Sequence, residues 1–167
     1  MVIVSEISLL KQIDHPNIIK LKEIIVSRPN RRNAQRGSTF LVFEYMHHDF
    51  AGLFKMKVKF SLPEIKCILT QIIEGVAYLH RNKILHRDIK SANILLNDEG
   101  YVKLADFGLG RKTRLESYLT YKVVTLWYRA PELLLGCKTY GDKIDVWSIG
   151  CVVVEFFTGD VLFKSKF

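Results

Sequence analysis

One short stretch near the middle of the chain, residues 86–93, carries residue types that could do chemistry on a phosphate group. Asp88 can accept a hydrogen bond from an attacking hydroxyl and orient it, and Lys90 can place positive charge beside a transferring phosphoryl group. Asn93 offers a neutral amide oxygen, which suits a hard cation such as Mg²⁺. Further on, the carboxylate of Asp106 could be the second metal ligand. We therefore expect phosphoryl-transfer chemistry with a cation held by Asn93 and Asp106.

Three motifs follow one another in a fixed order, and their order is more specific than any one of them. His-Arg-Asp begins at residue 86, Asp-Phe-Gly occupies residues 106–108, and Ala-Pro-Glu occupies residues 130–132. Either of the first two alone could be a polar turn or a chance triplet, but the ordered set rarely arises by chance. On these motifs the chain resembles a protein kinase.

Longer segments indicate which group of protein kinases the chain resembles. The run from Thr120 to Gly136 is similar to the activation segment of cyclin-dependent kinases. Residues 40–49 and 80–85 resemble the transcriptional branch of that family, especially the kinase of the positive elongation factor. The resemblance implies a truncated α+β protein-kinase-like fold. Residues 1–46 would form part of the small lobe and the hinge, and residues 47–167 would form part of the helical large lobe.

The resemblance also implies ATP and Mg²⁺ as cofactors and assigns roles residue by residue. The residues with catalytic roles would be Asp88, Lys90, Asn93 and Thr125, and the metal ligands would be Asn93 and Asp106. The residues that would bind or position the nucleotide are Glu6, Glu44, Met46, Asp49, Leu95 and Asp106. Plainer roles stay open for three of these: a surface carboxylate for Glu6, a helix N-cap for Asp49 and a core leucine for Leu95.

Regulation and substrate choice are implied in the same way. Thr120 matches the activating phosphothreonine, and Arg87 and Arg111 match arginines that would clamp its phosphate. The family usually has a third arginine where this chain has Ser5, which weakens the expected clamp. Val124 and Arg129 match the pair that favours proline after the phosphorylated residue. Proline has no N–H, so a pocket that leaves this N–H without a partner discriminates by desolvation.

The elements that must position these residues follow from periodicity and turn chemistry. Apolar residues at steps of three and four predict a helix over residues 1–13 that ends before Pro16. Strands are predicted over residues 18–26 and 40–45, the second of them buried because it is almost wholly apolar. Ser61 and Glu64 have the spacing of a capping box and predict the start of a long amphipathic helix.

The second half of the chain predicts a hairpin and a buried helix. Short strands over residues 94–96 and 102–105 flank a turn, and they would bring Asn93 and Asp106 to neighbouring strand ends. A mostly apolar helix over residues 145–157, ended by Gly159, should be buried. By resemblance, Asp145 on this helix would anchor the catalytic loop. Gly110, where the family usually has alanine, should loosen the start of the activation segment.

Some expected parts do not occur in the sequence. It contains no Gly-x-Gly-x-x-Gly loop and no Val-Ala-x-Lys motif, and the arginine that normally pairs with Glu132 is missing. We therefore expect a fragment or partial gene model of a kinase that is weakly active or inactive alone. Because a buried glutamate without a partner is costly, we expect either that Glu132 is solvated or that its loop is disordered.

Composition bears on nucleic-acid binding, membrane insertion and cellular compartment. The net charge of +8 is compatible with a nucleic-acid binder, but the run of Arg28, Arg31, Arg32 and Arg36 lies in a segment typical of a solvated loop. We expect no direct nucleic-acid partner. No signal pattern and no membrane-spanning run is found. The odd set of Cys67, Cys137 and Cys151 indicates reduced thiols in the nucleus or cytoplasm.

The function predicted from these residues is a proline-directed, cyclin-dependent Ser/Thr protein kinase. The implied partners are a cyclin and substrates with Ser/Thr-Pro sites, in particular the RNA polymerase II C-terminal repeats, and the implied location is the nucleus. The alternative is a catalytically incompetent module that binds a cyclin or a substrate.

Overall fold

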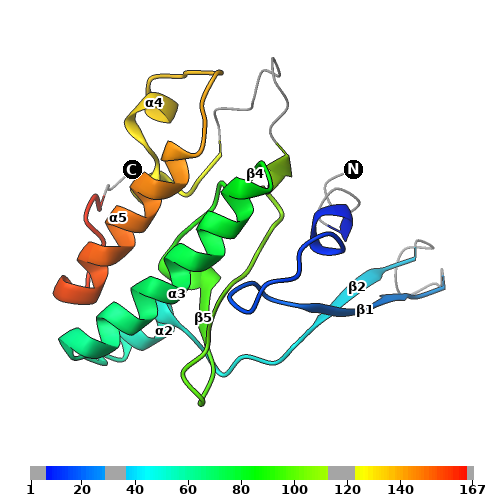
Figure 1. Cartoon of the computed structure of the whole chain (residues 1–167), viewed down its shortest axis with the longest axis horizontal. Coiled ribbons are helices and arrows are strands. Elements are labelled where there is room, and N and C mark those ends of the chain that lie inside the picture. Colours follow the sequence, from blue (N-terminus) through cyan, green and yellow to red (C-terminus); the bar gives the residue numbers. More distant parts are fainter. Residues whose placement is uncertain (1–6, 29–36, 113–122, 165–167) are drawn as a thin grey trace.

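The described part of the chain combines helices with three small sheets (Figure 1). The computed structural model describes residues 7–28, 37–112 and 123–164. A two-stranded sheet of β1 (Leu21–Val26) and β2 (Thr39–Phe43) extends to one side, and the long helices α3 (Leu62–Arg81) and α5 (Lys143–Thr158) lie on the other. The predicted mixture of helix and sheet is confirmed.

The first described segment is helical only over residues 7–10. The sequence predicted a helix to residue 13, so that prediction is wrong at its end. The N–H of Gln12 donates to the carbonyl of Leu9 at 2.9 Å, and that of Ile13 to Leu10 at 3.4 Å. These i→i−3 bonds tighten the last turn and end the helix early. Residues 1–6, with Ser5 and Glu6, lie outside the described residues.

β1 and β2 pair in antiparallel fashion, with Val26 opposite Thr39 and Leu21 opposite Phe43. The predicted burial of the second strand is wrong, because Phe40 is 55% exposed and every other residue of β2 is exposed or half-buried. An apolar strand is buried when layers cover both of its faces. Among the described residues β2 has one strand neighbour, β1, and stands at the edge of the molecule.

A three-stranded sheet carries the predicted hairpin. Its strands, in order across the sheet, are β3 (His48–Asp49), β5 (Ile94–Leu96) and β6 (Val102–Leu104). Leu95 lies opposite Asp49 on one side and Lys103 on the other. The β5–β6 turn ends at Gly100, whose φ of 85° is readily adopted by glycine. The hairpin is confirmed, one residue shorter than predicted.

Helix α3 begins and packs as its sequence predicts. The Glu64 carboxylate accepts hydrogen bonds from the backbone N–H of Ser61 at 2.7 Å and from its hydroxyl at 2.6 Å, which lowers the pKa of Glu64. The buried stripe of the helix consists of Ile65, Ile68, Ile72, Gly75, Val76 and Leu79. The preceding short helix α2 (Phe50–Lys55) is capped by Asp49, whose Oδ1 accepts from the Gly52 N–H at 2.8 Å.

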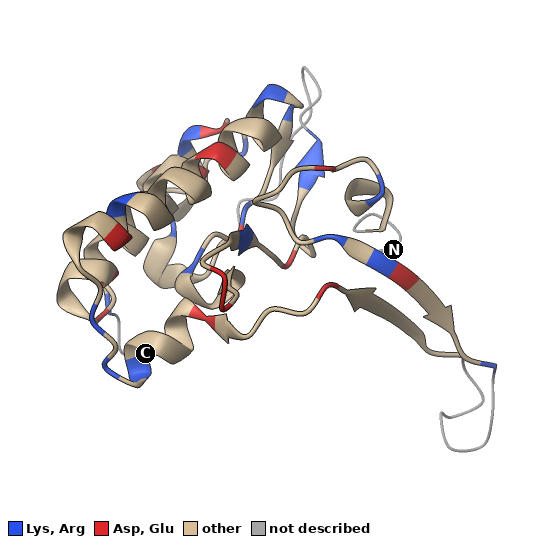
Figure 2. Cartoon of the chain, turned by 60° about the horizontal axis from the view of Figure 1, so that its bottom comes forward, with Lys and Arg blue, Asp and Glu red and all other residues tan. Residues whose placement is uncertain are grey.

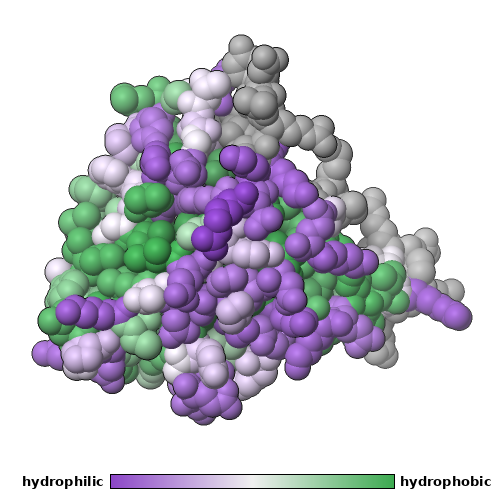
Figure 3. Space-filling model, in the orientation of Figure 1, coloured by the Kyte–Doolittle hydropathy of each residue, from purple (hydrophilic) through white to green (hydrophobic). Residues whose placement is uncertain are grey.

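Helix α5 is only partly buried. It ends at Gly159, which has a left-handed φ of 74°, as predicted. Ile144 and Val152 are fully buried, but Trp147 is 39% exposed and Phe157 is 62% exposed. Prediction of a wholly buried helix is therefore wrong for one face. Figure 3 shows hydrophobic residues at the surface over α3 and α5.

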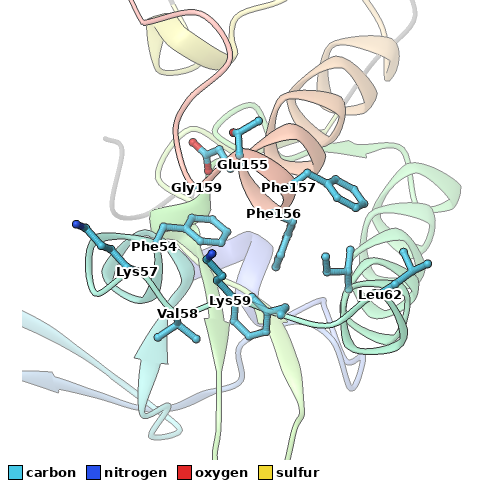
Figure 4. Close-up of a pocket in the computed structure, with 12 residues that line it drawn as sticks. Phe54, Lys57, Val58, Lys59, Leu62, Glu155, Phe156, Phe157 and Gly159 are labelled. Atoms are coloured by element: carbon cyan, nitrogen blue, oxygen red, sulfur yellow. The ribbon is translucent and has the colours of Figure 1, made fainter.

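A pocket of about 520 Å³ lies between α2, the start of α3 and the end of α5 (Figure 4). Its walls include Phe54, Phe156 and Phe157, and Glu155 is the acidic residue that lines it. The catalytic-loop residues 86–93 are not among its lining residues.

Charges on the described surface are mixed in sign. Figure 2 shows Lys and Arg interspersed with Asp and Glu along the helices and on β1. The described residues include no helix long and apolar enough to span a bilayer. The three cysteines are free thiols: Cys67 is exposed, Cys137 is half-buried and Cys151 is buried.

Candidate functional site

The loop of residues 86–93 is fixed to α5 by one buried carboxylate. Asp145 is fully buried; its Oδ2 accepts from the His86 N–H at 3.0 Å, and its Oδ1 accepts from the Arg87 N–H at 2.9 Å. The Nε2 of His80, near the end of α3, lies 2.8 Å from the same Oδ2. These bonds hold Arg87 at a left-handed φ of 66°. The anchoring contact that the resemblance implied for Asp145 is therefore present.

His86 fixes the loop from its other side. Burial lowers the pKa of His86, so the imidazole is neutral. Its Nδ1 accepts from the Asp88 N–H at 3.3 Å, which leaves Nε2 as the protonated nitrogen that donates to the Ala105 carbonyl at 3.1 Å. The ring also packs on Phe107, with ring centroids 4.8 Å apart. One side chain thus ties the loop to the Asp-Phe-Gly segment.

Asp88 is the centre of a dense hydrogen-bond network. Its Oδ1 accepts from both the hydroxyl and the N–H of Thr125, at 2.9 and 3.1 Å. Its Oδ2 accepts from the ammonium of Lys90 at 2.7 Å and from the Asn93 amide at 3.1 Å. Lys90 also donates to the Thr125 hydroxyl at 3.1 Å. The structure therefore brings together the four residues that the sequence analysis assigned to catalysis.

Two opposing effects set the charge of Asp88. Burial raises its pKa, whereas hydrogen bonds from Lys90 and Thr125 and the charge of Lys90 lower it. The lowering effects are the larger together, so the pKa of Asp88 lies below its ordinary value and the carboxylate is ionised at neutral pH. An ionised carboxylate at this point can orient a hydroxyl donor.

The expected metal ligands lie on adjoining backbone. The carbonyl of Asn93 accepts from the Ala105 N–H at 2.9 Å, directly before Asp106. The Asn93 side-chain nitrogen donates to Asp88, so its oxygen is the atom that could ligate a cation. Asp106 is exposed, with a φ of 62° and one oxygen bonded to the Gly108 N–H at 3.2 Å. Within the described ranges no cluster of three or more His, Cys, Asp or Glu could hold a metal.

The expected nucleotide contacts occupy the hinge and the adjoining sheet. Glu44 donates its N–H to the Lys20 carbonyl at 3.1 Å, so this position can offer only its carbonyl oxygen to an adenine. Met46 and Leu95 are half-buried and pack against the core. Asp49 caps α2, which is the plainer role left open for it. Glu6 lies outside the described residues.

Arg87 and Arg111, the expected phosphate clamp, lie at one strand pair, Arg111 within it and Arg87 just after it. Arg111 lies in β7 (Arg111–Lys112), which pairs with β4 (Ile84–Leu85) just before Arg87. The Nε of Arg87 donates to the Leu109 carbonyl at 2.6 Å, and its Nη1 donates to the Tyr140 hydroxyl at 3.1 Å. Thr120 lies outside the described residues.

Val124 has a backbone conformation that is costly for a β-branched residue. Its φ is 65°, and its carbonyl accepts from the Arg129 side chain at 2.9 Å from Nη2 and 3.3 Å from Nε. The Arg129 Nε also donates to the Val123 carbonyl at 2.9 Å. The Val124 carbonyl is thus engaged within the chain, and it faces an arginine instead of an incoming peptide N–H.

Sequence reasoning missed a buried polar cluster beneath this segment. The Tyr128 hydroxyl, which lies 3.2 Å from the Ser91 hydroxyl, donates to Oε1 of Glu155 on α5. Glu155 is 2% exposed, and burial raises its pKa. Burial also raises the pKa of Tyr128, so its hydroxyl stays protonated. The available signal was a single glutamate inside an apolar helix, which calls for a buried partner.

Two departures from the family pattern have local explanations. A Cβ on Gly110 would lie 3.2 Å from Leu9 Cδ1 and 3.1 Å from the Phe107 carbonyl oxygen, so glycine here permits close packing. The looser segment expected from this glycine stays a prediction. Glu132 is half-buried at the first turn of α4 (Pro131–Leu134), so it keeps contact with solvent, as expected.

Comparison with known families matches residues 1–166 to the protein kinase domain. Cyclin-dependent kinase C-2 of Oryza sativa subsp. japonica is 44% identical over 175 residues, which cover 98% of this chain and 34% of that protein. Cyclin-dependent kinase G-2 of Oryza sativa subsp. indica is 47% identical over 164 residues, or 96% of this chain and 22% of that protein. Proteins of this name are serine/threonine protein kinases.

A solved structure shows the same fold. One chain of the yeast RNA Pol II CTD kinase CTDK-1 complex matches with a TM-score of 0.90 and 42% identity. The match covers 99% of this chain and 52% of that chain. This chain therefore spans about half of the solved chain, and about a third or less of the curated relatives named above.

Proposed function

Because the chain belongs to the protein kinase domain family, we propose that it provides the catalytic loop of a cyclin-dependent Ser/Thr protein kinase. The reaction is transfer of the γ-phosphoryl group of ATP to a protein hydroxyl. The observation that carries the proposal is the network at Asp88, in which a lysine, a threonine and an asparagine converge on one ionised carboxylate. A structural turn does not require three converging side-chain donors.

In this mechanism Asp88 accepts a hydrogen bond from the substrate hydroxyl and aligns it with the phosphorus. Lys90 lies 2.7 Å from Asp88 and is close enough to neutralise charge that develops on the transferred group. Thr125 holds both, because its hydroxyl donates to Asp88 and accepts from Lys90. Catalysis then consists of positioning and electrostatic stabilisation, which is the usual basis of phosphoryl transfer.

The donor set at Asn93 and Asp106 fits Mg²⁺, since it consists of an amide oxygen and a carboxylate on adjoining backbone. A bound Mg²⁺ would neutralise charge on the phosphates of ATP. The chain's own contribution is to orient the two ligands. Asp88 fixes the Asn93 amide through hydrogen bonds at 2.9 and 3.1 Å, and the Gly108 N–H fixes one oxygen of Asp106.

Preference for proline after the target residue is supported by Val124 and Arg129. Because the Val124 carbonyl is engaged by Arg129, the N–H of an ordinary following residue would be buried there without an acceptor. Proline has no N–H and avoids this cost. Replacing Arg129 by Met should release the carbonyl and reduce the preference for Ser-Pro over Ser-Ala peptides.

For the whole protein we propose a cyclin partner, Ser/Thr-Pro substrates and activation by phosphorylation of Thr120. The RNA polymerase II C-terminal repeats are the proposed substrate, supported by the name of the yeast complex that the structure resembles. The proposed location is the nucleus, with the cytoplasm as a second compartment.

The test is phosphate incorporation into a Ser-Pro repeat peptide, with ATP and Mg²⁺, in the presence and absence of a cyclin. We expect at most weak incorporation by the chain alone, and its complete loss in Asp88→Asn, which leaves the side chain nearly the same size. Equal incorporation by both proteins would exclude Asp88 as the residue that orients the hydroxyl. No incorporation by either protein, together with capture of the cyclin, would favour the binding-module function instead.

A further inference from the structure

The carboxylate of Glu44 joins three parts of the chain at the hinge. Its Oε1 accepts from the backbone N–H of Lys20 at 2.8 Å and lies 2.8 Å from the ammonium of Lys103. Lys20 directly precedes β1, Glu44 directly follows β2, and Lys103 lies in β6. One oxygen atom therefore connects the two-stranded sheet, the hinge and the hairpin.

Among the described residues this ion pair and the catalytic-loop pair of Lys90 with Asp88 are shielded from water, unlike the exposed lysine pairs. The side chains of Lys103 and Glu44 are 14% and 24% exposed. Those of Lys20 and Asp14 are 69% and 89% exposed, and those of Lys164 and Asp160 are 60% and 62% exposed. Exposed ion pairs contribute little to stability, because water screens their charges and their long side chains lose conformational entropy when they pair. A shielded pair that shares its acceptor with a backbone N–H holds a defined geometry instead.

The position of Lys103 in β6 connects the ion pair to the expected nucleotide site. Lys103 lies opposite Leu95, the residue expected beneath the adenine. Its neighbour Leu104 is fixed by two backbone bonds of 2.9 Å, one to Asn17 and one to Ile19. Strand β6 ends at Leu104, and Asp106 follows two residues later. Lys103 is thus joined to the proposed metal ligand through two residues, Leu104 and Ala105, whose backbone groups are hydrogen-bonded.

We propose that Lys103 is a positioning residue for nucleotide binding, which fixes the hinge backbone at Glu44 relative to the metal-binding end of the hairpin. Through Glu44 it sets the direction of the one backbone group, the carbonyl, that this hinge position can offer to a purine. The inference deepens the proposed function and rests on it for the identity of the ligand. The hinge geometry itself is independent of any nucleotide.

The first experiment therefore needs no nucleotide. In Lys103→Met the side chain stays long and unbranched but loses its charged end, so Glu44 should be released. We expect the Lys20 and Glu44 amides, followed by hydrogen exchange, to exchange at least about threefold faster, with the Val76 amide of α3 unchanged. Lys103→Arg should restore the slow exchange.

A matched control lies in the same region. Lys20→Met removes the ammonium that pairs with exposed Asp14 but leaves the Lys20 N–H that Glu44 accepts. This variant should exchange like the unaltered chain. Unchanged exchange in Lys103→Met, or equal acceleration in both variants, would overturn the proposal.

The second experiment measures affinity for Mg·ATP and the kinetics of peptide phosphorylation. Lys103→Met should raise the KM for ATP about threefold to tenfold, as expected for loss of one shielded pair, and leave kcat at saturating ATP nearly unchanged. Glu44→Gln should have the same effect on the KM for ATP, and the double variant should raise this KM little further than either single variant. A merely structural role would lower kcat and stability together.

The two experiments separate the two ideas. If the unaltered chain binds no nucleotide while exchange at the hinge responds to Lys103, the proposed function fails and the hinge contact stands. If nucleotide binds and Lys103→Met has no effect on its KM, the role in nucleotide positioning is wrong although the kinase assignment survives.

Discussion

At the scale of single residues, the site depends on the competition between burial and hydrogen bonding. Asp88 and Glu155 are both buried carboxylates, and they are shifted in opposite directions. Asp88 has Lys90 and Thr125 as donors, so its charged form is favoured. Glu155 has Tyr128 as its donor, and its Oε2 is buried without a partner among the described residues. The first is therefore suited to chemistry and the second to structure.

The opposite shifts predict opposite pH dependences of stability. The lowered pKa of Asp88 contributes stability above the ordinary value of 3.8, which is lost as the pH falls through the lower folded value. The raised pKa of Glu155 means that the folded state holds a proton that the unfolded state has released, so stability falls as the pH rises above 4.5. Denaturant unfolding of Glu155→Gln between pH 4 and 7 should lack this decline. The same slope in both proteins would contradict it.

Removal of one hydroxyl should reveal the buried cluster. Tyr128→Phe leaves Glu155 without its donor, so the free energy of unfolding should fall by about 1–3 kcal/mol. Chemical denaturation measures the change, with Tyr45→Phe as the control because Tyr45 is 76% exposed. If both variants lose the same stability, the hydroxyl of Tyr128 has no special structural role.

At the scale of elements, helix α5 holds two segments of the site in place. Asp145 near its start holds the catalytic loop, and Glu155 near its end holds Tyr128 of η3 (Leu126–Tyr128). Ser148, between them, donates its hydroxyl to the Tyr128 carbonyl at 2.9 Å. One helix thus positions both the loop that carries Asp88 and the segment that carries Thr125 and Val124.

Loss of the Asp145 anchor should therefore be costly. Asp145→Ala leaves two buried backbone N–H groups and His80 without their partner, and we expect a loss of about 3–5 kcal/mol in the free energy of unfolding. Asp14→Ala is the control, since Asp14 is 89% exposed, pairs with exposed Lys20 and should change stability by less than about 0.5 kcal/mol. Similar losses in the two variants would argue against the anchor.

Elements with strong local signals were predictable and those made by long-range contacts were not. Helix α3 has a capping box and a continuous apolar stripe, and both are local. The β4–β7 pair has two residues in each strand and no periodicity to detect. The Asp88–Thr125 contact joins residues far apart in sequence, so only the family resemblance placed them together. The left-handed φ of Val124 contradicts its residue type, as happens where a functional geometry overrides local preference.

At the scale of the whole molecule, hydrophobic side chains remain at the surface around α5. Val146, Trp147 and Phe163 are 50%, 39% and 50% exposed, and the rings of Trp147 and Phe163 stack 6.0 Å apart. Together with Leu162 they line a largely apolar hollow of about 500 Å³. Exposed apolar patches of this kind promote association in water.

The chain should therefore associate as its concentration rises. Replacing Trp147 and Phe163 together by Gln should reduce the average mass observed by sedimentation velocity, with only a small change in melting temperature because both rings are exposed. Lys66→Gln and Lys138→Gln, made together, control for a general change of surface, because both residues are exposed and neither lines the hollow. An unchanged mass distribution in the aromatic variant would show that this hollow does not drive association.

The attachment of two loops to one helix has a consequence for inhibition and for adaptation. A compound wedged beneath α5, or a substitution that tilts it, would disturb Asp145 and Ser148 at once. The turnover rate and the preference for a target sequence should then change together. A substitution in α5 that alters specificity would therefore also lower the rate.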